Sequence, residues 1–134
     1  MFYLHEFKSK YSFLSEDLYY IFISLLTLLI AIFLHEMGHY IASFYYGLNP
    51  IFGINFNAIY VETGFLSLKI HEIVSHAGPI LNLIISFFVV TFLFIRGHTC
   101  SMKDHTSFIL FSMIITNLLV ALISLILFPF SEVL

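Results

Sequence analysis

Three long apolar runs dominate the pattern of hydrophobic and polar positions along this chain. The runs at 18–34, 77–95 and 106–131 contain no Asp, Glu, Lys or Arg. A helix rises about 1.5 Å per residue, so each run is long enough, alone or with its flanks, to cross about 30 Å of hydrocarbon. The pattern predicts three transmembrane helices, with spans at 18–46, 71–96 and 106–130.

The stretch between the first two spans changes from long runs to alternation. Apolar and polar side chains alternate over residues 54–60, with two asparagines on the polar side, which is typical of a half-buried strand. A turn at Glu62-Thr63-Gly64 then leads into a second strand that includes Leu68. We expect a membrane-associated β-hairpin over residues 51–70, between the first and second helices.

Residues that start and stop helices set the expected ends of the spans. Gly47 ends the first span, and Pro50 prevents the helix from continuing. Residues 1–17 mix aromatic and charged side chains, and we interpret them as an interfacial segment with Ser15 as the helix N-cap. Pro79 stands near the expected start of the second span, where a proline costs little because the early amides lack intrahelical partners.

Composition places the chain among integral membrane proteins. Of its 134 residues, 60% are hydrophobic and 10% are charged, which is far outside the norm for soluble proteins. The first apolar run lies behind a polar stretch and has no small-residue cleavage site, so we expect it to be retained rather than removed as a signal peptide. We expect one α-helical, multi-pass domain in the lipid bilayer of the cell membrane.

Charge and cysteine content argue against other classes of protein. The formal net charge is −3 and the chain has no basic cluster, so we expect no nucleic-acid partner. The single cysteine, Cys100, cannot form a disulfide within the chain.

A group of ionisable residues lies inside the first apolar region. His35 and His39 are four positions apart, which places them about 40° apart around a helix axis, so both imidazoles can face one metal ion with Glu36 beside them. This pattern is typical of a zinc hydrolase in which the glutamate is the general base. Hydrogen-bonded histidines beside a buried acid are the structural alternative. Ionisable groups are costly in lipid, however, and there they usually mark function.

A hydrolytic zinc needs a third protein ligand beyond the two histidines. Chain direction places the motif late in the first span, Asn82 early in the second and Glu132 at the end of the third. In an up-down-up bundle these positions lie on the same side of the membrane. Its position therefore favours Glu132 as the third zinc ligand. Glu62, Glu72 and the remaining histidines stay open as candidates.

The residues from Phe33 to Ala42, FLHEMGHYIA, resemble the metal-binding helix of the site-2 protease family of intramembrane zinc metalloproteases. In that family a membrane-embedded β element follows, similar to the alternating stretch of this chain. The next family helix opens with Ala-Gly-Pro and then Asn, and Ala77-Gly78-Pro79 followed by Asn82 is similar to it. The resemblance covers about residues 21–132.

The third signature of the family is an Asn-Leu-Leu-Pro run before an Asp-Gly pair, whose Asp completes the zinc ligands. The similar stretch here is 124–133, in which Glu132 falls where the family has Asp. The Asn, the first Pro and the Gly of that signature are absent. The resemblance implies zinc held by His35, His39 and Glu132, with the carboxylate set one methylene further out than in the family.

The resemblance also implies a reaction, the hydrolysis of a peptide bond in a membrane-embedded peptide or protein. Glu36 would take a proton from zinc-bound water and pass it to the departing amine, and Asn82 would steady the substrate or the developing oxyanion. For Asn82 a helix-to-helix hydrogen bond is the structural alternative. The edge of the hairpin would hold an extended substrate through main-chain hydrogen bonds.

A non-catalytic protein that binds a metal or a membrane peptide, including an inactive protease relative, is the alternative for the whole chain. Glu36 separates the two classes, because metal binding needs the histidines but no general base.

The orientation of the bundle in the membrane also has two possible interpretations. Four of the five Lys and Arg residues lie on the amino-terminal side of the bundle, against Lys69 on the other, and the positive-inside rule puts that side in the cytoplasm. The resemblance implies the reverse.

Overall fold

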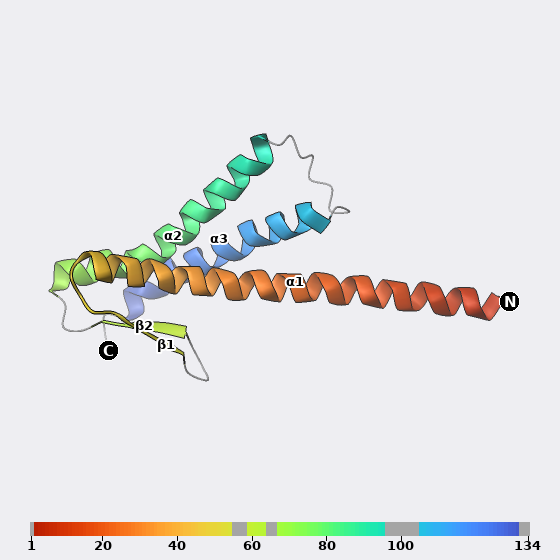
Figure 1. Ribbon diagram of the computed structural model, residues 1–134, viewed down its shortest axis with the longest axis horizontal. Coiled ribbons are helices and arrows are strands. Elements are labelled where there is room, and N and C mark those ends of the chain that lie inside the picture. The colour runs from red at the N-terminus through yellow and green to blue at the C-terminus, as the bar shows by residue number, and fades with distance from the viewer. Residues whose placement is uncertain (1, 55–58, 64–66, 96–104, 132–134) are drawn as a thin grey trace.

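The computed structural model describes residues 2–54, 59–63, 67–95 and 105–131, without the side chains of 2–15, 68 and 128–131. Within these residues the chain forms three helices and one small hairpin (Figure 1). The elements in chain order are α1 (Phe2–Tyr45), β1 (Ile51–Ile54), β2 (Ile59–Glu62), α2 (Leu68–Ile95) and α3 (His105–Ser131).

Each helix contains a stretch that is long and apolar enough to cross a membrane. These stretches are Glu16–Tyr45, Lys69–Ile95 and His105–Leu127. In the described part of the chain, all three predicted spans are therefore confirmed as long apolar helices. Large apolar side chains such as Phe22 and Phe87 are exposed on the outside of the bundle, as expected for a surface that faces lipid.

Small and polar residues form the interior between the helices. Ala31, Asn82 and Ala121 are fully buried. The hydroxyls of Thr27 in α1 and Ser112 in α3 lie 2.7 Å apart, so they join these two helices by a buried hydrogen bond. Small side chains let helix backbones approach closely, and uncharged hydrogen bonds add specificity in lipid.

The helices run up, down and up, as the sequence predicts. α1 and α2 are antiparallel, because the later residue of α1 contacts the earlier residue of α2: His39 contacts Val74, and Ala31 contacts Asn82. Contacts between α1 and α3 follow in the same order along both helices. The carboxyl-terminal parts of α1 and α3 therefore meet the amino-terminal part of α2 at one end of the bundle (Figure 1).

The amino-terminal part of α1 extends well beyond the other two helices (Figure 1). Because α1 already begins at Phe2, Ser15 lies within the helix, and the predicted N-cap is wrong. No Gly or Pro occurs before Gly38, so nothing in this part of the chain interrupts a helix once it has formed. The interfacial role of residues 1–17 stays a prediction.

The β-hairpin is confirmed, but its turn lies earlier than predicted. β1 and β2 pair antiparallel, and Ile54 is opposite Ile59. β1 ends at Ile54 and β2 begins at Ile59, so the predicted single strand over 54–60 is wrong; residues 55–58 between them lie outside the described residues. That segment contains two asparagines, which favour turns, and their spacing resembled the polar face of a strand. Glu62 lies inside β2 and Leu68 begins α2, so the predicted turn and second strand are also wrong.

Pro79 lies inside α2 and not near its start, because the helix begins eleven residues earlier, at Leu68. Proline lacks the amide that would bind the carbonyl of Ser75, and its ring crowds that carbonyl, so it bends a helix. Figure 1 shows α2 bending along its length. The carbonyl of Val74, just before this bend, accepts a hydrogen bond from His39 of α1.

α1 and α2 cross at two glycines. A Cβ atom on Gly38 would lie 2.6 Å from the carbonyl oxygen of Ala77 and 2.8 Å from Cα of Gly78. A Cβ atom on Gly78 would lie 2.5 Å from Nε2 of His39. The backbone of α2 therefore lies directly against the histidine motif, closer than a side chain on either glycine permits.

Candidate metal centre

His35 and His39 bring their ring nitrogens together on one side of α1. Their Nε2 atoms lie 3.1 Å apart. Two nitrogens that are each about 2.0–2.1 Å from a tetrahedral zinc lie about 3.3 Å from one another. The separation of the two nitrogens therefore fits a shared metal ion with almost no rearrangement.

The backbone of α2 determines the tautomer of His39. Nδ1 of this ring lies 2.7 Å from the carbonyl oxygen of Val74. A carbonyl oxygen only accepts hydrogen bonds, so Nδ1 carries the proton and donates it. In the neutral ring Nε2 then has a free lone pair, which faces His35. A metal-binding histidine is commonly oriented in this way, by a carbonyl on its other nitrogen.

Glu36 belongs to the same group of side chains. A carboxylate oxygen of Glu36 and one ring nitrogen from each histidine all lie within 4.8 Å of one another. The carboxylate is half-buried and accepts a hydrogen bond from the backbone amide of Val61 in β2. The structure thus brings together the three residues of the motif in a group that can hold a metal ion, with the hairpin against the carboxylate.

No further His, Cys, Asp or Glu among the described residues joins this group. Glu62 and Glu72 are exposed and lie outside it. Glu132, the predicted third ligand, lies outside the described residues, so its role stays a prediction. α3 nevertheless reaches the level of the motif, because the hydroxyl of Ser124 contacts His35.

Asn82 makes the helix-to-helix hydrogen bond that was its structural alternative. Its side-chain amide nitrogen lies 3.3 Å from the carbonyl oxygen of Ala31, which is four residues before His35 in α1. The side chain is fully buried, and its Oδ1 atom has no hydrogen-bond partner within the described part of the chain. Asn82 therefore ties α2 to the turn of α1 that precedes His35, and its contact with a substrate stays a prediction.

Ser124 joins the histidines, although the sequence marks it only as the first residue of the stretch that is similar to the third family signature. Its hydroxyl oxygen lies 3.3 Å from Nε2 of His35. A serine in an apolar helix is usually unremarkable, because its hydroxyl bonds to the backbone of its own helix. The contact with His35 depends on how α3 packs against α1, which residue spacing alone does not reveal.

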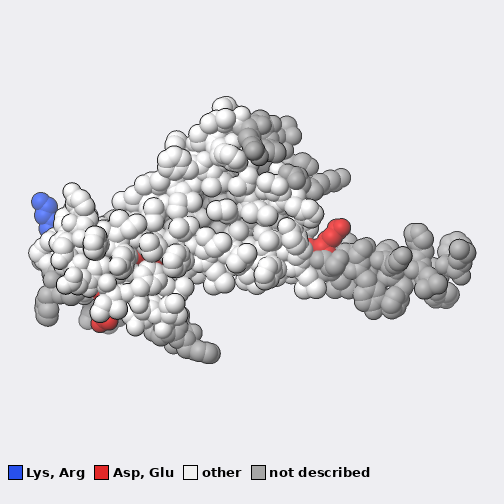
Figure 2. Space-filling view, in the orientation of Figure 1, with Lys and Arg blue, Asp and Glu red and all other residues white. Residues whose placement is uncertain are grey.

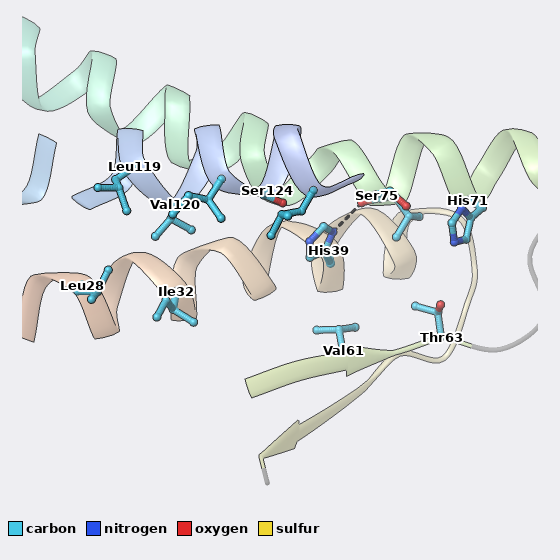
Figure 3. Close-up of a pocket in the computed structure, with 13 residues that line it drawn as sticks. Leu28, Ile32, His39, Val61, Thr63, His71, Ser75, Leu119, Val120 and Ser124 are labelled. Atoms are coloured by element: carbon cyan, nitrogen blue, oxygen red, sulfur yellow. Dashed lines mark hydrogen bonds between the residues drawn. The ribbon is translucent and has the colours of Figure 1, made fainter. Parts of the chain in front are cut away.

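A pocket of about 790 Å³ opens beside the centre (Figure 3). His39 from α1, Ser124 from α3 and Val61 from the hairpin all stand on its wall. Polar side chains, including Thr63 and Ser75, line the part near the hairpin and the start of α2. Apolar side chains line the part between α1 and α3, namely Leu28, Ile32, Leu119, Val120, Ile123 and Leu127. The pocket therefore connects the centre with the apolar faces of two helices.

Charged side chains lie mainly toward the ends of the described molecule. On the face shown in Figure 2, the body of the described molecule is uncharged apart from one small acidic patch between its middle and the end that carries the hairpin. Glu16 begins the apolar stretch of α1, whereas Glu36 lies nine residues before its end at Tyr45. An ionisable side chain this far inside an apolar helix is costly in lipid, so its presence indicates a functional site.

Comparison with known proteins adds no family assignment. No protein-family model, no curated protein and no solved structure matches this chain. Function therefore has to be argued from the centre itself and from the motifs around it.

Proposed function

We propose that this protein is an intramembrane zinc metalloprotease of the cell membrane, which hydrolyses a peptide bond in a membrane-embedded peptide or protein. The observation that carries the proposal is the 3.1 Å separation of the two Nε2 atoms of His35 and His39, with the carboxylate of Glu36 in the same group. All three residues lie in a helix that is apolar enough to cross a membrane. Their types and spacing are those of zinc hydrolases, and the resemblance to the site-2 protease family supplies the reaction.

Zinc is the proposed ion because imidazole and carboxylate ligands in tetrahedral geometry suit it. His35 and His39 would hold it through their Nε2 atoms. Glu132 is the proposed third ligand, on the grounds of its position at the end of α3 and its place in the signature. Val74 supports this arrangement, because its carbonyl keeps the Nε2 lone pair of His39 free for the metal.

The carboxylate of Glu36 is the proposed general base. Bound zinc would make a coordinated water acidic enough to ionise near neutral pH and would polarise the substrate carbonyl. Glu36 would take the proton of that water and deliver it to the departing amine. The hydrogen bond from the amide of Val61 holds the carboxylate of Glu36 in place beside the two histidines.

The pocket beside the centre is the proposed place for the substrate. A membrane helix hides its carbonyls in its own hydrogen bonds, so a segment has to be extended before it is cut. Among the described residues β2 pairs only with β1, and Val61 and Thr63 of this region line the pocket. The amide of Val61 is already bonded to Glu36, so we propose that the remaining main-chain groups on the other edge of β2 bind an extended substrate segment.

The experiment that tests the proposal combines metal analysis with a Glu36→Gln variant. Wild-type protein and Glu36→Gln, purified in detergent and supplied with zinc, should each contain about one zinc per chain. Membranes from cells that produce either protein are then compared by mass spectrometry of newly formed peptide termini. Termini that depend on the wild-type protein should disappear with Glu36→Gln, because water attack loses its general base.

Glu72→Gln is the matched control, since it removes an exposed carboxylate of α2 that lies outside the metal group and the pocket, and it should leave zinc content and termini unchanged. Wild-type protein that stays free of zinc would contradict the metal site. Stoichiometric zinc with the same termini in wild type and Glu36→Gln would instead assign the chain to the non-catalytic metal-binding class.

A further inference from the structure

We infer that the hydroxyl of Ser124 donates a hydrogen bond to the oxygen ligand of the metal at this centre and so stabilises the oxyanion that forms during peptide hydrolysis. The inference rests on the proposed function and adds a catalytic residue to it. The resemblance gives Ser124 no such role, and the observation behind the inference is its contact with His35.

The Ser124 hydroxyl does not bond to the described backbone of its own helix. Four other helix hydroxyls return to a carbonyl of their own helix four residues earlier, as is usual in apolar helices. Such bonds are made by Ser24 to Tyr20 at 2.8 Å, Ser86 to Asn82 at 3.0 Å, Thr91 to Phe87 at 2.8 Å and Thr116 to Ser112 at 2.8 Å. The hydroxyl of Ser124 instead faces Nε2 of His35 on another helix.

The contact between Ser124 and His35 is a weak one. At 3.3 Å it is longer than the roughly 2.7–3.0 Å of a strong hydrogen bond from a hydroxyl. The same Nε2 atom also faces Nε2 of His39. Once the lone pairs of both nitrogens are committed to a metal, the hydroxyl hydrogen of Ser124 needs another acceptor. An oxygen atom bound to that metal would be such an acceptor, because the Ser124 hydroxyl lies 3.3 Å from one of the two nitrogens.

Asn82 is less well placed for this task. Its amide nitrogen already donates to the carbonyl of Ala31, one turn away from the histidine nitrogens along α1. Ser124 lines the pocket in which we place the substrate, next to His39 (Figure 3), whereas Asn82 does not line it. A donor aimed at the developing negative charge is usually the largest single contribution to such a reaction.

A binding experiment with a small anion tests the role of Ser124 without an identified substrate. The zinc site is loaded with Co²⁺, and acetohydroxamate is titrated while the visible spectrum of the metal is recorded. Ser124→Ala should bind acetohydroxamate about ten- to a hundredfold more weakly than wild type, because it lacks one hydrogen bond to a charged oxygen. Its Co²⁺ content should not change. Ser124→Thr keeps the hydroxyl and should restore most of the affinity.

Ser86→Ala is the matched control, because it also removes a serine hydroxyl from a helix of the bundle, but one that donates to the backbone carbonyl of Asn82 in its own helix. It should bind acetohydroxamate like the wild type. Unchanged affinity in Ser124→Ala would overturn the role of Ser124 and leave the proposed protease standing. Loss of Co²⁺ from Ser124→Ala would also overturn it, since Ser124 would then position His35. Wild-type protein that takes up neither Co²⁺ nor zinc would overturn the proposed function together with this inference.

Discussion

Replacing Gly78 by alanine should disable the metal centre with a single methyl group. The added Cβ would lie 2.5 Å from Nε2 of His39 and 2.8 Å from the backbone carbonyl oxygen of His35. Ordinary van der Waals contact begins at 3.4 Å, so the ring of His39 or the helix has to move by about 0.9 Å. Ligand distances in a working zinc site vary by only about 0.2 Å, so this movement exceeds the tolerance of the site several times over.

The expected effect of Gly78→Ala is a fall in zinc affinity of at least ten- to a hundredfold, the range usual for losing a group that orients a ligand. Zinc affinity is measured on detergent-purified protein by competition with a chromophoric chelator, and helix content by circular dichroism without metal. Gly47→Ala is the control. Its Cβ would meet nothing within 4 Å, although Gly47 has a φ of 73° that costs a side chain about 1 kcal/mol at the end of α1.

Gly47→Ala should therefore lose some thermal stability and keep its zinc affinity, whereas Gly78→Ala should lose zinc affinity while keeping most of its helix content. A Gly78→Ala protein that binds zinc as tightly as the wild type would refute the reasoning, because the close contact between α2 and His39 would then not matter for the site.

The remaining predictions concern the ligands and the buried amide. His35→Ala and His39→Ala should each lose the bound zinc, as measured by metal analysis of the purified proteins, and retained stoichiometric zinc in either would sink the assignment. Glu132→Ala should lose zinc as strongly as a histidine variant while Glu132→Asp keeps part of it. If zinc content fell in Glu62→Ala but not in Glu132→Ala, the third zinc ligand would be Glu62 of the hairpin and not Glu132. Asn82→Ala should keep zinc and lose about 1 kcal/mol of stability, seen as earlier thermal unfolding in detergent, since it removes one interhelical hydrogen bond. Loss of zinc without loss of stability would instead place Asn82 at the metal.

Local spacing determined the parts of this protein that the sequence predicts well. Three apolar runs became the three long helices, because the length of an apolar run decides whether a helix can cross lipid. His35, Glu36 and His39 came together because positions three and four apart share a face of any helix. The alternation after Gly47 predicted a hairpin, but the same asparagines suit a strand face and a turn, so the position of its turn was wrong.

Contacts between segments far apart in the chain were decided only by the tertiary structure. The hydrogen bond from His39 to Val74, which sets the tautomer of the ring, joins residues 35 positions apart. Asn82 found its partner in Ala31, and the hydroxyl of Ser124 turned to His35 across 89 positions. Helix period says which residues share a face, but it does not say which face of another helix will lie opposite, or at what height. Here the close approach at Gly38 and Gly78 sets that height, because backbone can touch backbone only where side chains are missing.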